Sequence, residues 1–165
     1  MPPRSAGLLP YRLGDGRVLE VLVVHPGGPF WANKDDGSWS IAKGECEPDE
    51  DLEHAARREF REELGREPPP GPLIDLGELR QPSRKLVRVW AVEGDLDVDN
   101  LVSNEFEMEW PPHSGQLVSW PEVDRAAWMS VTTARRKLLR GQVGFVDRLV
   151  ELVSETLGTN FSLGT

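Results

Sequence analysis

The feature that most constrains this chain is a predicted amphipathic helix, from Asp51 to Leu64, with well-marked ends. Its apolar residues recur at helical spacing and form one stripe: Leu52, Ala55, Ala56, Phe60 and Leu64. Gly65 supplies a stop signal, and the prolines at positions 68–70 prevent the helix from resuming. The pattern therefore predicts a helix with one face turned to a core and with defined ends.

The same helix concentrates negative charge on one face. Glu59, Glu62 and Glu63 stand at positions i, i+3 and i+4, so their side chains share a face about one turn deep. Three like charges repel one another and cost stability. A divalent cation reverses that sign, because Mg²⁺ and Mn²⁺ prefer hard oxygen ligands grouped on a rigid element. The alternative interpretation is a solvated helix face, since Glu-rich helices are common.

The overall charge limits the class of ligand. The chain has 165 residues with 19 Lys and Arg against 28 Asp and Glu, a formal net charge of −9. This excess argues against a polymeric nucleic acid partner, because gripping many phosphates requires a basic surface. It does not argue against small phosphate esters, which acidic enzymes bind when a divalent metal supplies the positive charge.

Other features limit the compartment and the domain organisation. Cys46 is the only cysteine, so no intrachain disulfide can form. No stretch approaches the ~20 apolar residues of a membrane span, and residues 1–5 contain no signal-like apolar segment. His25, His54 and His113 share no metal-binding spacing, so we do not expect a zinc site. We expect a single cytoplasmic domain over residues 1–165, with no membrane partner and with the last ten or so residues loose.

The remaining sequence predicts strands and two further helices. Residues 6–13 and 18–24 read as a hairpin joined at an Asp-Gly turn, and residues 39–41 as a short extended piece. Strands are expected at 73–79, 85–92 and 126–129, and helices at 132–139 and 143–152. The acidic stretch 93–120 reads as irregular, with a half-exposed strand inside residues 104–112.

Fixed residues around the acidic helix complete a longer pattern. Gly44 precedes Glu50 by six positions, Glu50 precedes Arg58 by eight, and Gly65 follows Glu63 by two, which gives G-x5-E-x7-R-E-F-x-E-E-x-G. This segment resembles the signature of the Nudix hydrolases, with Arg66 in a place where the family usually has an apolar residue. The resemblance implies an α/β fold, an α/β/α sandwich around a mixed β-sheet, over most of the chain.

The resemblance also implies roles for the residues of the segment. Glu59, Glu62 and Glu63 become Mg²⁺ ligands, with Mn²⁺ as a substitute, and the backbone carbonyl of Lys43 is a further candidate ligand. The remaining matched positions are structural: Gly44 permits a close or unusual backbone turn, Glu50 and Arg58 form an ion pair, and Gly65 ends the helix.

The implied reaction is attack of water on a phosphorus of a diphosphate linkage, assisted by two or three metal ions. Glu62 and Glu63 are then catalytic, and a carboxylate outside the segment often completes such sites. Glu122 is our candidate, because it stands six residues before Trp128 in a stretch that resembles the late E-x5-W segment of dinucleoside polyphosphate hydrolases. The other candidates are Glu105, Glu107 and Glu109, and the alternative for Glu122 is a structural carboxylate after Pro121.

The substrate is less constrained. Residues 30–45 resemble a bacterial subgroup described as predicted nucleoside triphosphate pyrophosphohydrolases, and also diadenosine tetraphosphate hydrolases, although Ala42 stands where the latter usually have proline. The Lys43 ammonium suits a polyphosphate oxygen, unless it is an exposed turn lysine. Other candidate substrate contacts are Trp31 and Trp39, which stack on a base or belong to the core, and Arg84 and Lys85, which hold distal phosphates or only solubilise a turn.

We therefore expect a Mg²⁺-dependent hydrolase of nucleoside or dinucleoside polyphosphates. The alternatives are ADP-ribose or another nucleotide sugar, diphosphoinositol polyphosphates, and a non-catalytic Nudix-like ligand sensor. The sensor predicts loss of the glutamates of the signature, and all of them are present. The expected partner is a small phosphate anhydride, and the expected state is a monomer or a homodimer.

Overall fold

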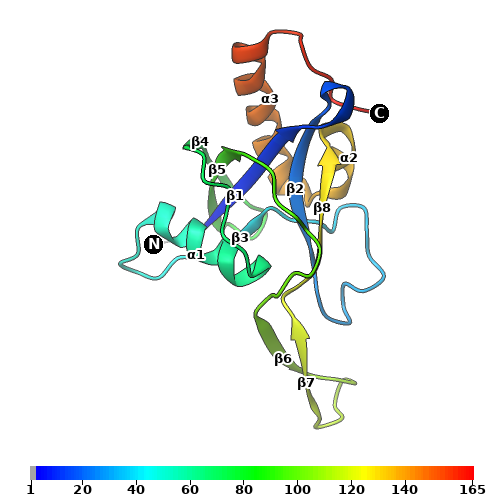
Figure 1. The fold of residues 1–165 in the computed structure, drawn as a ribbon. Helices are drawn as coiled ribbons and strands as arrows, with labels where there is room; N and C mark the ends of the chain where they lie inside the picture. Colours follow the sequence, from blue (N-terminus) through cyan, green and yellow to red (C-terminus); the bar gives the residue numbers. More distant parts are fainter. Residues whose placement is uncertain (1–2) are drawn as a thin grey trace.

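The fold is organised around β1 (Arg4–Leu13), a buried strand at the centre of a mixed sheet (Figure 1). The structure, a computed structural model, describes residues 3–165. The sheet order is β4-β5-β1-β2-β8, with β3 paired to β1; β1 and β5 are parallel and the other pairs antiparallel. The other strands of this sheet are β2 (Leu19–Pro26), β3 (Ala42–Glu45), β4 (Leu73–Arg80), β5 (Leu86–Glu93) and β8 (Val123–Ser130).

One edge of β1 is shared between two partners. Residues 11–13 pair with β2, whereas residues 5–8 pair with β3, so the two partners follow one another along the same edge. Helix α1 (Leu52–Leu64) packs over β1 and β3. This arrangement places the outer edge of β3 beside the charged face of α1.

Alternating strand residues build two separate apolar layers. One side of the sheet packs against α2 (Val131–Lys137) and α3 (Val143–Leu157), through residues such as Leu9, Val21, Phe145 and Leu149. The other side packs against α1, through residues such as Leu8, Leu22 and Phe60. The predicted α/β/α sandwich with a mixed sheet is confirmed.

The ends of the helices follow from their caps. Asp51 is the N-cap of α1 rather than its first residue, since its carboxylate accepts a hydrogen bond from the His54 amide at 3.1 Å. Gly65 ends the helix in the left-handed conformation, at φ +65°, and donates to the Arg61 carbonyl. Helix α3 runs on to Leu157, beyond the predicted end at residue 152, because no breaker occurs before Gly158.

The stretch predicted as irregular contains a complete hairpin. Strands β6 (Glu105–Glu109) and β7 (Leu117–Pro121) pair with each other in a two-stranded sheet, which projects from the body of the molecule (Figure 1). Only the first of them was expected from the sequence. β7 is short and its residues alternate in partial exposure, so its apolar content gives a weak strand signal.

The expectation of a loose C-terminal segment is wrong for the residues after α3. Ser162 pairs with Val18, and its carbonyl accepts from the Leu19 amide at 2.8 Å. Phe161 and Leu163 pack against the apolar layer beneath α2 and α3. These two apolar side chains hold the segment that was expected to be loose. Among residues 3–165, no helix is both long and apolar enough to cross a membrane.

The expected extended piece at residues 39–41 is held by isolated bridges and by a buried amide side chain. Gln142 is fully buried, its Oε1 accepts from the Ile41 amide at 2.7 Å, and its Nε2 donates to the Ser40 hydroxyl at 3.1 Å. One side chain from the turn before α3 therefore satisfies the backbone that leads into β3.

Replacing Gln142 with leucine should destabilise the fold. The Ile41 amide would remain buried without an acceptor, at a cost of about 1–3 kcal/mol in the free energy of unfolding. Urea denaturation measures this value. The exposed Gln116 is the matched control, and Gln116→Leu should change the same value by less than about 0.5 kcal/mol. Equal effects of the two substitutions would contradict the role of the buried amide.

Candidate active site

The candidate site lies where the charged face of α1 meets the outer edge of β3. Burial of Phe60 and Leu64 against the sheet fixes the rotation of the helix, and this turns Glu59 and Glu63 toward β3. A Cβ atom on Gly44 would lie 2.0 Å from the carboxyl carbon of Glu59. Gly44 is therefore required for close approach, and its φ does not lie in the left-handed region.

The backbone of Lys43 faces the helix and not β1. Its amide donates to Glu63 Oε1 at 2.9 Å, although Lys43 lies directly opposite Gly7 in the antiparallel ladder. In such a ladder the N–H and C=O groups of one residue point to the same side. The carbonyl of Lys43 therefore also points away from β1, toward the side on which Glu63 lies.

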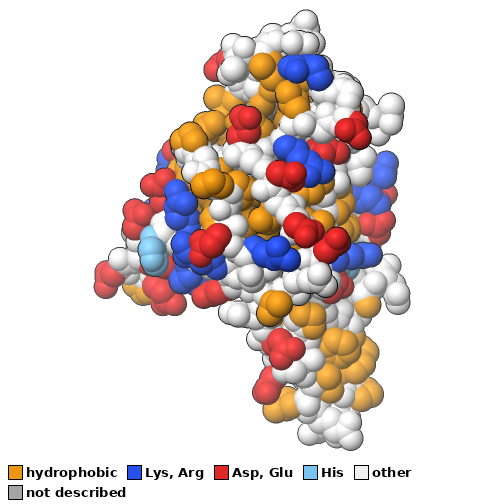
Figure 2. Space-filling view, viewed as in Figure 1, with side chains coloured by type: hydrophobic (Ala, Val, Ile, Leu, Met, Phe, Trp, Pro, Cys, Tyr) orange, Lys and Arg blue, Asp and Glu red, His pale blue; other side chains and the backbone are white. Residues whose placement is uncertain are grey.

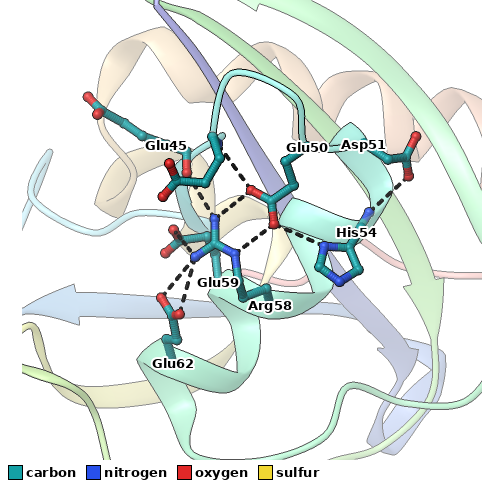
Figure 3. A network of polar contacts seen from close by, with 8 residues as sticks. Glu45, Glu50, Asp51, His54, Arg58, Glu59 and Glu62 are labelled. Carbon is teal, nitrogen blue, oxygen red and sulfur yellow. Dashed lines mark hydrogen bonds and ion pairs between the residues drawn. The ribbon is translucent and has the colours of Figure 1, made fainter.

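Glu50 and Arg58 form the expected ion pair, which ties the loop before α1 to the helix (Figure 3). The guanidinium donates two hydrogen bonds to the carboxylate, from Nε at 2.7 Å and from Nη2 at 2.8 Å. These bonds and the Glu47 amide lower the pKa of Glu50 to about 2. The carboxylate is thus ionised at all ordinary pH values and the pair is permanent.

Arg58 also contacts residues other than Glu50, and its spacing in the sequence had not indicated these contacts. Its Nη1 donates to Glu59 at 2.9 Å and to Glu62 at 3.1 Å, and its Nη2 also donates to the Glu45 carbonyl (Figure 3). Among the residues that the structure describes, no three acidic, His or Cys side chains converge in a metal-holding geometry. In this arrangement the cation between Glu59 and Glu62 is the guanidinium of Arg58.

A series of backbone hydrogen bonds brings Glu122 to the same place. The Asn104 amide donates to the Glu62 carbonyl, and the Glu122 amide donates to the Asn104 carbonyl, both at 2.8 Å. The Gly27 amide in turn donates to the Glu122 carbonyl at 2.9 Å. The end of α1, the start of β6, the β7–β8 junction and the loop after β2 are therefore joined through main-chain groups.

The carboxylates at this junction influence one another. Burial is the main cause that raises the pKa of Glu59 and the pKa of Glu63, the latter to about 8, and Glu122 raises both further. Burial and the charge of Glu62 raise the pKa of Glu122 itself. Glu122 is thus an electrostatic neighbour of the helix glutamates, whereas Glu105, Glu107 and Glu109 occupy the exposed face of β6.

Two of the predicted cations lie at the edge of this cluster. The Lys43 side chain is largely buried, and burial together with the charge of Lys85 lowers its pKa, while Glu63 and Glu59 oppose that shift. Lys85 forms an ion pair with Glu45 at 2.8 Å. Arg84 is exposed in the turn between β4 and β5, at φ +71°, and the structure gives it no contact with the cluster.

The two tryptophans proposed to stack on a base have different positions. Trp39 is 5% exposed, its Nε1 donates to Asp35, and its ring packs edge-on to His25. The proposal that Trp39 stacks on a base is therefore wrong, because core packing encloses the ring. Trp31 is only half-buried and lines a hollow of about 410 Å³ that also contains Glu122.

A buried histidine fixes the loop that carries Trp31. His25 is fully buried, with Nδ1 2.9 Å from an Asp124 carboxylate oxygen and Nε2 2.7 Å from the Lys34 carbonyl. These two contacts, one to the start of β8 and one to the loop after β2, fix the orientation of the ring and tie the loop to the sheet. The sequence had indicated only that His25 belongs to no metal motif.

Comparison with known proteins agrees with this geometry. The model of the NUDIX domain family matches residues 1–149. No curated protein matches the chain.

Solved structures with this fold include three well-covered examples. A C. elegans Ap4A hydrolase binary complex is 20% identical, with a TM-score of 0.64, over 92% of this chain and 98% of that one. The NUDIX domain of Shewanella oneidensis NrtR, complexed with ADP ribose, is 14% identical, with a TM-score of 0.62, over 93% and 89%. A mutT/nudix family protein from Listeria innocua is 16% identical, with a TM-score of 0.58, over 94% and 97%.

At these identities the structures show a common fold, and the match of the family model over most of the chain shows the family. The chain belongs to the NUDIX domain family.

Proposed function

We propose that this protein is a Mg²⁺-dependent hydrolase that cleaves a P–O–P linkage in nucleoside or dinucleoside polyphosphates, with Mn²⁺ as a substitute metal. One observation carries the proposal. Glu59 and Glu63 are partly or largely buried on one face of α1, and backbone hydrogen bonds bring Glu122 beside them from the β7–β8 junction, where its charge raises the pKa of both helix carboxyl groups. Such an arrangement costs stability unless positive charge is added.

The donor set suits a hard divalent cation. Carboxylate and carbonyl oxygens are the ligands that Mg²⁺ and Mn²⁺ prefer, and the Lys43 carbonyl lies on the Glu63 side of β3. Arg58 already compensates Glu50, Glu59 and Glu62, which leaves Glu63 and Glu122 without a direct cationic partner among the ion pairs of residues 3–165. We propose Glu59, Glu62, Glu63, Glu122 and the Lys43 carbonyl as the metal-binding groups.

The chain's own residues then have separate roles. A bound divalent ion would supply positive charge for the phosphates and acidify a water molecule. Burial raises the pKa of Glu63 and of Glu122, and a carboxylate with a raised pKa is a stronger proton acceptor than an ordinary one. The Lys43 ammonium lies beside the cluster and is suited to bind a phosphate oxygen, and Lys85 adds positive charge next to it.

The structural neighbours support a nucleotide substrate. One is named an Ap4A hydrolase and another was solved with ADP ribose, and both of those compounds contain adenosine and a diphosphate linkage. ADP-ribose or a related nucleotide sugar is therefore the second candidate substrate class.

We further propose that residues 1–165 act as one cytoplasmic domain, as a monomer or a homodimer, on a small phosphate anhydride and without a polymeric nucleic acid or a membrane as partner. The net charge of −9 and the lone Cys46 support these assignments.

Neutralising the helix glutamates should abolish turnover. Glu62→Gln and Glu63→Gln each remove a negative charge with little change of shape, and each should lower Mg²⁺-dependent kcat at least about 100-fold. The assay uses diadenosine tetraphosphate, ATP and ADP-ribose as substrates, with products separated by chromatography. Glu53→Gln, at an exposed position of α1, is the control. Turnover within a few-fold of the parent enzyme would show that the glutamates are not the metal ligands.

The late carboxylate can be assigned by a second comparison. Glu122→Gln should lower kcat about 10–1,000-fold, because it removes a charge from the cluster. Glu107→Gln and Glu109→Gln change exposed side chains of β6 and should leave kcat within about two-fold. If Glu122→Gln is active and either of the others is inactive, the late carboxylate has been misplaced.

Glu63 should also make stability depend on pH when divalent metal is removed. Its folded-state pKa, about 8, is raised above the ordinary 4.5, so its contribution to stability is complete below pH 4.5 and is lost as pH rises through 8. In EDTA, the free energy of unfolding of the parent protein, measured with urea, should fall between pH 5 and pH 8 by roughly 2–4 kcal/mol relative to that of the Glu63→Gln variant.

Magnesium should reverse this loss at pH 8 in the parent protein, because metal binds the deprotonated carboxylate. A difference between parent and Glu63→Gln that stays constant with pH would contradict the buried, uncompensated carboxyl group.

A further inference from the structure

The hollow beside Glu122 is built from two segments that lie far apart in the sequence. One wall is the loop that follows β2, with Phe30 and Trp31, and the other is the inner face of β6, with Phe106 and Met108. Its volume of about 410 Å³ is within the range of ~300–1,000 Å³ typical of small-molecule sites. Glu122 also lines it, so one carboxylate of the cluster borders the hollow.

The hairpin presents an apolar face to this hollow because its residues alternate. Phe106 and Met108 are half-buried, whereas Glu105, Glu107 and Glu109 point to the exposed face. Figure 2 shows hydrophobic side chains gathered over the hairpin that projects from the body. A two-stranded hairpin of this kind is only marginally stable in isolation, so its position depends on its contacts with the rest of the molecule.

Two glycines provide that attachment. A Cβ atom on Gly28, which has φ +95°, would lie 2.9 Å from Cζ of Phe106, and one on Gly27 would lie 2.0 Å from the Pro121 carbonyl oxygen. The loop after β2 can therefore lie directly against both strands of the hairpin. The ring of Phe106 is held beside the loop that carries Phe30 and Trp31.

The charge of the hollow limits what it can hold. Among residues 3–165, Glu122 is the only charged residue that lines the hollow. The aromatic side chains of the lining are partly exposed to solvent. Phe30 is 62% exposed, with Lys34 Nζ over its ring at 3.6 Å and Trp31 edge-on to it. A highly phosphorylated ring would meet the Glu122 carboxylate and a mostly apolar wall, and the Lys34 ammonium over the Phe30 ring would offset only part of its charge. An uncharged planar ring would meet aromatic faces and the Met108 thioether.

We propose that this hollow receives the nucleobase of the substrate, and that Phe106 on the β6–β7 hairpin and Trp31 are the residues that determine base binding. The inference rests on the proposed function, because the phosphates of the same molecule would lie at the carboxylate cluster. It selects nucleotides over diphosphoinositol polyphosphates as the substrate class.

Binding of two non-hydrolysable probes tests the proposal without turnover. Adenosine 5′-(α,β-methylene)diphosphate and methylenediphosphonate share the P–C–P group, and only the first carries a base. Calorimetric titration with Mg²⁺ should show at least about 10-fold tighter binding of the nucleotide to the parent protein. Phe106→Ala and Trp31→Ala should each reduce this ratio to within about three-fold and leave the Kd of methylenediphosphonate unchanged.

The matched control is Glu107→Ala, which changes the exposed face of the same strand and should preserve the ratio. Phe106→Leu keeps an apolar side chain against Gly28 and should lower the ratio with the hairpin intact, as judged by circular dichroism. Equal affinities of the two probes for the parent protein, or a ratio that survives both aromatic substitutions, would overturn the proposal. Failure of the proposed hydrolase function would appear separately, as turnover that is independent of Mg²⁺ or of Glu63.

Discussion

The repulsion among partly buried carboxylates is the interaction on which the site depends. Glu59 and Glu63 are poorly solvated, and burial raises the pKa of each. The fold nevertheless brings them against β3, through the missing side chain of Gly44 and the amide of Lys43. Such an arrangement needs positive charge, and the chain itself supplies only part of it.

Arg58 supplies part of this positive charge, and its contacts explain the spacing between the residues of the signature. One guanidinium binds Glu50 with two hydrogen bonds and also contacts Glu59 and Glu62. It therefore both ties down the loop before α1 and bridges two of the acids. Glu63, which accepts from the Lys43 amide, and Glu122, which lines the hollow, make no ion pair with Arg58 among the described residues. The charge that a metal would bring is needed at these two carboxylates.

Local geometry explains which features could be predicted from the sequence. The three helix glutamates share a face whatever surrounds the helix, and the Glu50–Arg58 pair spans one loop. The wall formed by Phe106 could not be foreseen, because its neighbour Gly28 is distant in sequence and a half-exposed hairpin has a weak apolar pattern.

Long-range contacts also account for the sequence predictions that were wrong. Trp39 is enclosed through His25 and its bond to Asp35, and composition cannot distinguish such a ring from one that faces a ligand. The C-terminal residues are held by Val18, Leu19 and Thr132, which belong to other parts of the chain.

The central claim is that the carboxylate cluster at β3 binds a divalent cation. Anomalous diffraction from crystals grown with Mn²⁺ tests it most directly, because the signal identifies the metal and its place. We predict a manganese peak about 2.1 Å from carboxylate oxygens of Glu59 and Glu63. Crystals with manganese bound elsewhere, or with none bound while Arg58 keeps its contacts to Glu59 and Glu62, would contradict the claim.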